Sequence, residues 1–463
     1  MALPDLIEIV PLTAPVRAEI TVPGSKSITN RALILAALAD GETILEGALW
    51  SEDTQIMVEC LQELGFMVNV KPDPNDVCNR TITVYGAGGL VQPGGTESQP
   101  LELFVGNAGT AARFLAPFLC LGSGVYRLHG VPRMHERPQA ALFQALLELG
   151  YRIESENGNE KLPVRIFAGT AGRLPESYTQ FERRKASSDA QKKCQVSIAE
   201  SSQFASALLL SAKVGGWEIK VIGENIDEAP YVFLTRELVV EFDKRPNSFT
   251  IEQDSSSSSY FLAGSYLMSE SNVDEPPHIK AWRWMSASGA PTLPFFHQRD
   301  NNFISFLPLP EESISRARDL ADSIMTAIVI APFADHVVKF TDLGRLRVQE
   351  CERVVALRTE LTKCGAKVIE EGDTLTVYPS KLDELHGAEI ETYNDHRMAM
   401  CFAILGLKVP GIRIKNPACV KKTFPNFFQK LAAPPPHGLG AEIWEIYNGQ
   451  RARKLSGDDL FAD

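Results

Sequence analysis

Several stretches of the sequence place small polar residues and a cation where a strand leads into an apolar helix. One of them reads TVPGSKSITNRALILAALA from residue 21. Its Ser25, Lys26 and Ser27 precede a strongly helical run, and Arg31 follows one turn later. The unpaired N–H groups and the dipole of a helix N-terminus both favour negative charge, so the pattern predicts an anion site. A capped helix with two solvated cations is the alternative that these residues leave open.

A second stretch, LFVGNAGTAARFLAPFLCL at 103–121, has the same design. Gly109 lets backbone N–H groups approach a phosphate closely, while Asn107 and Thr110 add polar side chains. Arg113 follows one turn into the helix. A plain strand-to-helix turn would use the same residues, so this stretch alone leaves both interpretations open.

Further candidate anion ligands are spread along the chain. GVPRMHERPQ carries two arginines near prolines, AESSQF opens another helix with serines, and CVKKTF carries two lysines. TYNDHRMAM places His396 and Arg397 in the first turn of a helix that Asp395 would cap. A single histidine is more often a structural hydrogen-bond partner than a catalyst, but His396 is kept as a candidate catalytic residue.

Repeated elements would have to position these residues. Segments 53–70, 139–153 and 353–368 each show apolar residues at helical spacing, then a glycine, then alternating apolar residues. A degenerate copy at 234–251 has no glycine after its helix. This recurrence predicts repeated α/β units rather than one doubly wound sheet. The stretches outside the pattern are 171–193, 270–311 and the tail from 433.

Bulk composition limits the class of protein. A length of 463 residues predicts two domains of about 200 residues each. The net charge of −12 argues against nucleic acid as a partner, and no apolar run is long enough to span a bilayer. The start, MALPDLIEIV, lacks the pattern of a secretory signal. Eight scattered cysteines without a CxxC pair predict free thiols in the cytoplasm and no zinc site.

Ten motifs, in order, resemble those of one enzyme family. They are PGSKSITNRA, GNAGTAAR, PRMHERP, SSQF, PYVFLT, DSSSSSYFLA, DSIMTA, RVQECER, YNDHRMAM and KKTFP, and they cover about residues 8–432. Together they are similar to the 5-enolpyruvylshikimate-3-phosphate (EPSP) synthases. Enzymes of that family transfer the carboxyvinyl group of phosphoenolpyruvate to the 5-hydroxyl of shikimate 3-phosphate, release phosphate and use no metal.

The resemblance implies a fold and a domain layout. The expected fold is α/β, with two similar domains that are each an inside-out barrel of three βαβαββ units. It implies a first domain at 23–252 and a second made of 1–22 and 253–432. We expect residues 433–463 to be a flexible C-terminal extension. We also expect a monomer that binds small anionic substrates, without a cofactor and without membrane or nucleic-acid partners.

The resemblance also assigns roles to individual residues. Asp322 and Glu350 match the two acidic groups used for proton transfer, and Lys26 and His396 complete the expected catalytic set. The expected contacts to phosphoenolpyruvate are Lys26, Asn107, Gly109, Thr110, Arg113, Arg133, Gln203, Arg353, Arg397 and Lys422. The expected contacts to the acceptor are Ser27, Arg31, Ser201, Ser202, Gln203, Glu228, Tyr231, Arg345 and Gln349. Guanidinium forks fit carboxylate and phosphate geometry, which suits a small trianion.

The acceptor half departs from the family pattern. Glu228 stands where the family keeps a third serine for the shikimate phosphate, Gln349 where it keeps a lysine, and Arg345 where it keeps an asparagine. Loss of the lysine and the serine should weaken binding of the 3-phosphate by about 3–6 kcal/mol, or about 10²–10⁴-fold. The alternative is that the alignment shifts at Glu228 and that Arg345 replaces the lysine outright.

The sequence therefore favours a neofunctionalised enolpyruvyl transferase that acts on a shikimate-like ring acid without the 3-phosphate. An ordinary EPSP synthase of aromatic amino acid biosynthesis, a lyase or dehydratase on the same fold, and a non-catalytic binding protein are the alternatives. The retained phosphoenolpyruvate cations argue against the last two. The related transferase that acts on UDP-N-acetylglucosamine fits less well, because its loop cysteine has no counterpart in VPRMHERP.

Overall fold

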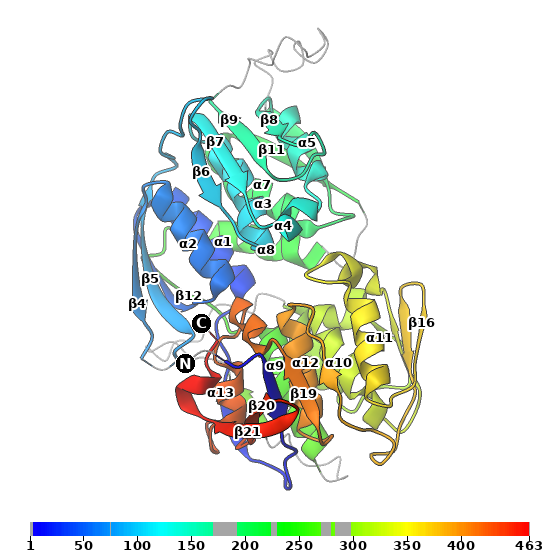
Figure 1. Cartoon of the computed structure of the whole chain (residues 1–463). Coiled ribbons are helices and arrows are strands. Elements are labelled where there is room, and N and C mark those ends of the chain that lie inside the picture. Colours follow the sequence, from blue (N-terminus) through cyan, green and yellow to red (C-terminus); the bar gives the residue numbers. More distant parts are fainter. Residues whose placement is uncertain are drawn as a thin grey trace. The chain divides into compact units, whose positions relative to one another are not determined.

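The computed structural model describes residues 3–74, 76–169, 192–223, 229–269, 279–282 and 298–462. These residues divide into two compact units (Figure 1). Unit 1 comprises Met1–Pro23, Asn75–Cys78 and Glu252–Asp463, and unit 2 comprises Gly24–Pro74 and Asn79–Ile251. The chain thus passes between the units near residues 23 and 251, and a short excursion from unit 2 returns residues 76–78 to unit 1.

Buried helices and small sheets build unit 2. Its helices are α1 (Lys26–Leu38), α2 (Glu52–Glu63), α3 (Gly109–Cys120), α4 (Pro132–Glu136), α5 (Ala140–Glu148), α7 (Ser202–Gly215) and α8 (Ala229–Asp243). The first sheet has the order β12-β3-β5-β4, from Ser248–Thr250, Asp40–Leu49, Asn79–Ala87 and Met67–Pro72. The second has the order β6-β7-β9-β8, from Leu101–Phe104, Gly124–His129, Val164–Ala168 and Arg152–Ser155. The third pairs β10 (Lys192–Ser197) with β11 (Trp217–Ile222). Every residue of α3 is buried, so helices rather than strands form the centre of the unit.

Unit 1 repeats this arrangement. Its helices are α9 (Ser255–Met268), α10 (Ile324–Ile330), α11 (Arg353–Lys363), α12 (His396–Gly406) and α13 (Phe427–Ala432). One sheet has the order β18-β19-β1-β20-β21, from Glu389–Ile390, Ile412–Lys415, Leu6–Ile9, Ile443–Tyr447 and Gln450–Leu455. Another has the order β14-β15-β17-β16, from Ile314–Ser315, Val338–Thr341, Thr374–Val377 and Val368–Glu371. The third pairs β13 (Ile279–Trp282) with β2 (Ala18–Thr21). All of α10 is buried, which again places helices inside and strands outside.

Short helical turns connect these elements in unit 1. They are η1 (Arg299–Phe306), η2 (Arg316–Leu320), η3 (Ala321–Ser323), η4 (Ala331–Phe333), η5 (Leu343–Val348), η6 (Pro417–Lys422) and η7 (Gly457–Leu460). Among them, η3 leads directly into α10 and so fixes where that helix begins.

The predicted helix–glycine–strand repeat is confirmed. Helices α2, α5 and α11 are followed by Gly65, Gly150 and Gly365, with φ of +79°, +90° and +90°, before β4, β8 and β16. Only glycine adopts such angles without strain, which lets the chain reverse directly after the helix. The degenerate copy follows the same path: Arg245, between α8 and β12, takes a φ of 53° in place of a glycine.

The prediction that the C-terminal tail is flexible is wrong for its described residues. Strand β20 pairs antiparallel with β1, and β21 pairs with β20. The carboxylate of Glu8 on β1 is buried, and it accepts hydrogen bonds from Arg413 Nε at 3.2 Å and Arg451 Nη2 at 2.6 Å. The prolines at 434–436 end α13 as expected, but the alternating apolar residues after them continue the sheet.

Two further observations concern the cysteines and a possible membrane span. All eight cysteines are free thiols, and all except the half-buried Cys351 are buried. In the part of the chain that the structure describes, no helix has both the length and the apolar character needed to cross a membrane.

A buried polar cluster holds the excursion at residues 76–78 within unit 1. Asp76 Oδ2 pairs with Lys430 Nζ of α13 at 3.0 Å, and Asp76 Oδ1 accepts from Asn426 Nδ2 at 3.2 Å. Lys430 Nζ also donates to Thr21 Oγ1 at 2.8 Å, and Cys78 Sγ accepts from the Asn426 backbone N–H at 3.3 Å. The excursion is thus fastened to α13, close in sequence to Lys422.

Replacing Asp76 should therefore destabilise the protein. Asp76→Ala leaves Lys430 in a mostly buried position without its carboxylate, which should lower the free energy of unfolding by about 3–5 kcal/mol. Urea-induced unfolding, followed by circular dichroism, measures the loss. Lys454→Met is the control, because its 2.6 Å pair with Glu442 is about half exposed and should contribute less than about 1 kcal/mol. Equal losses for the two variants would contradict a structural role for the cluster.

Candidate active site

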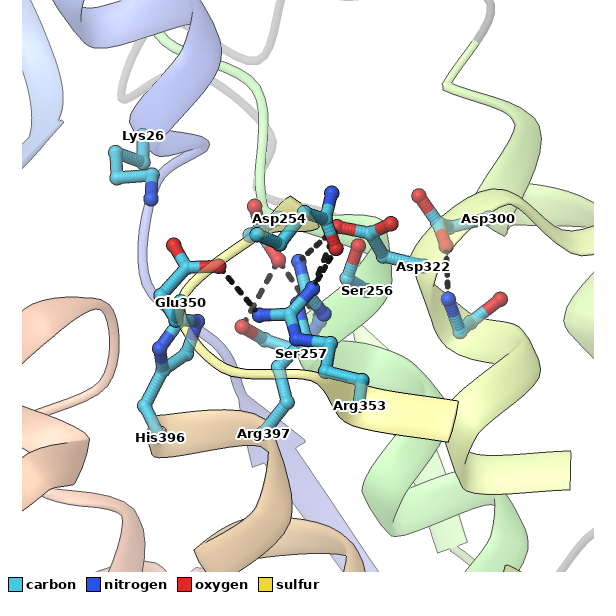
Figure 2. A network of polar contacts seen from close by, with 12 residues as sticks. Lys26, Asp254, Ser256, Ser257, Asp300, Asp322, Glu350, Arg353, His396 and Arg397 are labelled. Atoms are coloured by element: carbon cyan, nitrogen blue, oxygen red, sulfur yellow. Dashed lines mark hydrogen bonds and ion pairs between the residues drawn. The ribbon is translucent and has the colours of Figure 1, made fainter. Parts of the chain in front are cut away.

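In unit 1, charged side chains gather where helices begin (Figure 2). Asp254 caps α9 by accepting the Ser257 backbone N–H at 2.8 Å, and Asp395 caps α12 by accepting the Arg397 backbone N–H at 2.9 Å. Arg353 is the first residue of α11, and α10 follows directly on η3, which contains Asp322. Because helix N-termini favour negative charge, acidic side chains and bound anions compete for the same places.

Arg353 is the centre of this cluster and is 1% exposed. Its Nε donates to Asp395 Oδ2 at 2.7 Å, and its Nη2 donates to Asp395 Oδ1 at 3.2 Å and to Glu350 Oε2 at 2.8 Å. Its Nη1 donates to Gln349 Oε1. A planar guanidinium can serve all these acceptors at once, which a lysine cannot.

Asp322 lies among three arginines. Arg316 Nη2 donates to its Oδ1 at 2.9 Å, while Arg397 Nη2 and Arg353 Nη1 lie 3.4 Å and 3.6 Å from its Oδ2. Burial alone would raise the pKa of Asp322, but Arg397, Arg316 and Arg353 together hold that pKa well below its usual range. Asp322 is therefore ionised at neutral pH as long as these cations face it.

Glu350 joins the cluster to a lysine from a different element. Its Oε2 accepts from Arg353, and its Oε1 lies 3.3 Å from the Nζ of Lys422 at the end of η6. Lys422 is 6% exposed. The structure thus brings together the predicted residues Asp322, Glu350, Arg353 and Lys422, which are up to 100 residues apart in the sequence.

The first turn of α12 completes the cluster. Arg397 Nη1 donates to the buried hydroxyl of Tyr260 at 3.4 Å. His396 is buried, and its Nδ1 lies 3.7 Å from Asp395 Oδ1. Cys351 Sγ donates to Asp395 Oδ2 at 3.5 Å, and burial together with Asp395 raises the pKa of this thiol far above neutral pH. Cys351 is thus a poor nucleophile despite its place in the motif.

In unit 2, the predicted residues Lys26, Ser27 and Arg31 lie at the start of α1. Lys26 Nζ pairs with Asp53 Oδ2 at 3.0 Å. Arg31 is buried and donates from Nε to Thr235 Oγ1 at 2.8 Å and from Nη1 to the Ser27 carbonyl at 2.9 Å. These contacts orient the Arg31 guanidinium at the start of α1.

Residues from α3 and α7 form a second polar group in unit 2. Arg113 Nη1 donates to Gln203 Oε1 at 2.5 Å, and Gln203 Nε2 donates to Thr110 Oγ1 at 3.4 Å. Ser201 caps α7, where its hydroxyl accepts the Gln203 backbone N–H at 3.2 Å, and the buried Ser202 follows. The predicted serines and Gln203 therefore lie together at one helix start.

The sequence analysis noted both arginines of GVPRMHERPQ but assigned a site role to Arg133 alone, not to Arg137. Arg137 Nη1 donates to the Asn107 carbonyl at 3.3 Å, and a Cβ on Gly109 would lie 2.7 Å from the guanidinium nitrogens of Arg137. Glycine at 109 therefore lets a buried arginine reach the start of α3. The predicted Arg133 is instead largely exposed and pairs with Glu136 at 2.6 Å. The spacing of the two arginines in the sequence could not indicate which one points inward.

Other residues missed from the sequence are acids and one arginine of unit 1. They are Asp254, Asp300 and Arg316. In unit 2, the sequence analysis missed Asp53, the partner of Lys26.

Three predicted contacts to the acceptor remain to be placed. Tyr231 lies on α8 and accepts through its backbone carbonyl from Thr235 Oγ1 at 2.7 Å. Arg345 lies half-buried in η5, and Glu228 lies outside the described residues.

Comparisons with known proteins show the fold and the family of the chain. The fold is similar to that of EPSP synthase from Acinetobacter baumannii, with a TM-score of 0.63 and 20% identity over 95% of this chain and 100% of that one. It is also similar to the enolpyruvyl transferase NikO from Streptomyces tendae, with a TM-score of 0.60 and 14% identity over 95% and 98% of the two chains. These identities show the fold alone, which is that of the enolpyruvyl transferases.

Sequence comparison identifies the family within this class. The family description "EPSP synthase (3-phosphoshikimate 1-carboxyvinyltransferase)" matches residues 11–245 and 235–431. Relatives named 3-phosphoshikimate 1-carboxyvinyltransferase include one from Trichormus variabilis, 34% identical over 92% of this chain and 98% of the relative. Another, from Opitutus terrae, is 35% identical over 93% and 98%. The chain belongs to the EPSP synthase family and is a transferase of the carboxyvinyl type.

The role of Arg353 as the centre of the cluster gives a stability prediction. Arg353→Lys keeps the charge but cannot serve Asp395, Glu350 and Gln349 together, so we expect a loss of about 3 kcal/mol in the free energy of unfolding. Arg347→Lys is the matched control. Arg347 donates to Glu352, Glu370 and Asp373 but is about a quarter exposed, so its loss should be about 1 kcal/mol.

Denaturation in urea measures both variants under the same conditions. If Arg353→Lys is no less stable than Arg347→Lys, the carboxylates around Arg353 do not depend on the several N–H donors of its guanidinium.

Proposed function

We propose that this protein transfers the carboxyvinyl group of phosphoenolpyruvate to a hydroxyl of a shikimate-like ring acid that lacks a 3-phosphate. The observation that carries the transfer chemistry is the cluster of Asp322 and Glu350 with Arg353, Arg397 and Lys422. These are the residue types that a reaction between two anions with two proton transfers requires. The altered acceptor rests on Gln349 and on Glu228.

Phosphoenolpyruvate would be held mainly by cations. In this proposal Arg353 and Arg397 hold the carboxylate, and Lys26, Gly109, Arg133, Gln203 and Lys422 hold the phosphate. The geometry of Arg137 beside Gly109 supports adding Arg137 to the residues that shape the phosphate end. Bidentate guanidiniums and helix N-termini suit such a ligand, because both present fixed donors to planar or tetrahedral anions.

Proton transfer would be coupled to substrate binding. Asp322 and Glu350 now pair with the arginines and the lysine that a substrate carboxylate and phosphate need. When the substrate anion takes up these cations, the stabilisation of ionised Asp322 weakens and its pKa rises toward its ordinary value. The two acids then become able to exchange protons with the methylene carbon of the enolpyruvyl group and with the attacking hydroxyl.

Compared with shikimate 3-phosphate, the proposed acceptor has the carboxylate but not the 3-phosphate. Arg31 and Ser27 support the carboxylate, since Thr235 and the Ser27 carbonyl orient the Arg31 guanidinium at the start of α1. At the phosphate end, Gln349 replaces the family lysine, and its carboxamide oxygen accepts from Arg353. It thus acts as a neutral partner of the carboxylate-binding arginine. Ser201 and Ser202 alone would hold a 3-phosphate weakly.

An ordinary 3-phosphoshikimate 1-carboxyvinyltransferase is the second candidate. The names of relatives that are 33–35% identical favour it. In that case Arg345 would have to supply the charge that Gln349 lacks. A lyase or dehydratase is a weaker candidate, because it would not need all the cations kept for phosphoenolpyruvate.

Phosphate release from phosphoenolpyruvate separates these candidates. The unmodified protein should release phosphate with an unphosphorylated ring acid such as shikimate, and its KM for shikimate 3-phosphate should exceed that of an ordinary relative by about 10²-fold or more. The double variant Glu228→Ser with Gln349→Lys should recover part of that loss. Robust turnover of shikimate 3-phosphate by the unmodified protein would refute the altered acceptor.

A control matched in charge to the Gln349→Lys substitution alone is available. Gln450→Lys adds the same charge on the exposed strand β21, away from the cluster. It should leave the KM for every acceptor unchanged. If the double variant and this control behave alike, the assignment of Glu228 and Gln349 to the phosphate end is wrong.

A further inference from the structure

The segment 298–301, at the start of η1, binds the beginnings of two helices of the cluster. Gln298 Oε1 accepts the Ser255 backbone N–H at 3.1 Å, and Asn301 Oδ1 accepts from Ser255 Oγ at 2.6 Å, both at the start of α9. Between them, Asp300 Oδ1 accepts the Ser323 backbone N–H at 2.7 Å, where α10 begins. This segment belongs to the stretch 270–311, for which the sequence indicated no function.

Asp300 is buried, and its carboxylate accepts a hydrogen bond from the peptide that follows Asp322. Its side chain is 6% exposed, and Ser323 is fully buried. Asp300 Oδ1 accepts the Ser323 backbone N–H at 2.7 Å, and Figure 2 shows Asp300 close to Asp322. Because the Asp322–Ser323 peptide sets the direction of the Asp322 side chain, a contact to its N–H group limits where that carboxylate can point.

We propose that Asp300 is a positioning residue for Asp322, and that it also competes with Asp322 for the charge of Arg397. The proposal rests on the proposed function for its kinetic consequences but not for its structural ones. Asp322 faces Arg316, Arg353 and Arg397, and the peptide held by Asp300 keeps it there. When ionised, Asp300 also adds a second negative charge that acts on Arg397 beside that of Asp322.

The surroundings of Asp300 raise its pKa, whereas those of Asp322 lower its pKa. Burial and the neighbouring Asp322 raise the pKa of Asp300 to about 6, although Arg397 on α12 and the Ser323 N–H oppose this. The other charged groups near Arg397 are Asp254 on α9 and, next to Asp322, Arg316 on η2. Near pH 6 the charge of Asp300 therefore changes, while Asp322 stays ionised.

Asp300→Asn tests the proposal, because asparagine can still accept the Ser323 N–H but carries no charge. With one fewer acid near Arg397, we expect the KM for phosphoenolpyruvate to fall several-fold at about pH 7.5. We expect kcat to fall as well, because ionised Asp322 is held more firmly. The inflection near pH 6 in the rate profile of the unmodified enzyme should disappear. A merely structural residue would instead change kcat and KM without moving the inflection.

Asp319→Asn is the matched control. Asp319 Oδ2 also accepts a backbone N–H, that of Ser315 at 2.7 Å, and lies in η2 of the same region. This variant should keep the inflection near pH 6. If both variants keep it, or both lose it, the role assigned to Asp300 is wrong.

A readout without activity separates this proposal from the proposed function. A raised folded-state pKa favours folding at low pH, and this contribution is lost as pH rises through about 6. The Tm difference between Asp300→Asn and the unmodified protein should therefore become more positive from about pH 5 to about pH 7.5. The same shift should change in size when Asp322→Asn is added, because the two carboxylates interact.

A Tm difference that is constant with pH, or that is unaffected by Asp322→Asn, overturns the proposal whether or not the protein transfers a carboxyvinyl group. A pH-dependent and Asp322-dependent difference in a protein without transferase activity would support the contact and refute the proposed function alone.

Discussion

The buried guanidinium of Arg353 is the interaction on which the polar half of unit 1 depends. It neutralises Asp395, which caps α12, and it holds Glu350 and Gln349 at the start of α11. Removing water from so many charges is costly unless they are paired and hydrogen-bonded, so none of these acids can be buried without the arginine. The fixed positions of α11 and α12 then determine where Arg397 and Lys422 can meet an incoming anion.

Carboxylates face cations in both units, and neutral oxygens also accept from arginines in unit 2. In unit 2, Arg31 donates to Thr235 and Arg113 donates to Gln203, so neutral oxygens help to orient both guanidiniums. In unit 1, Arg353 and Lys422 face carboxylates. An anion that binds in unit 1 must displace acidic partners, which ties binding to a change in the proton affinity of those acids. In the proposed function, the carboxylates that face the cations of unit 1 would therefore link anion binding to proton transfer.

Much of the fold could be predicted from local patterns. The turns at Gly65, Gly150 and Gly365 follow from a backbone angle that glycine adopts without strain, and the helices before them follow from apolar spacing. The same reasoning failed where the pattern was carried by other residues. Arg245 takes the turn of a glycine, and the tail after the prolines joins a sheet through β1, a strand more than 400 residues earlier in the sequence.

The sequence by itself determined the family, the repeated helix–glycine–strand units and the identity of most cations and acids of the site. These features are local, since motifs, helix starts and glycine turns are read from neighbouring residues. Only the tertiary structure decided which charges face one another. It turned Arg137 inward and left Arg133 largely exposed, gave Gln349 a role as partner of Arg353, and brought Asp300 to the peptide after Asp322. Burial and the pairing of distant side chains set these outcomes, and neither is written in the spacing of residues along the chain.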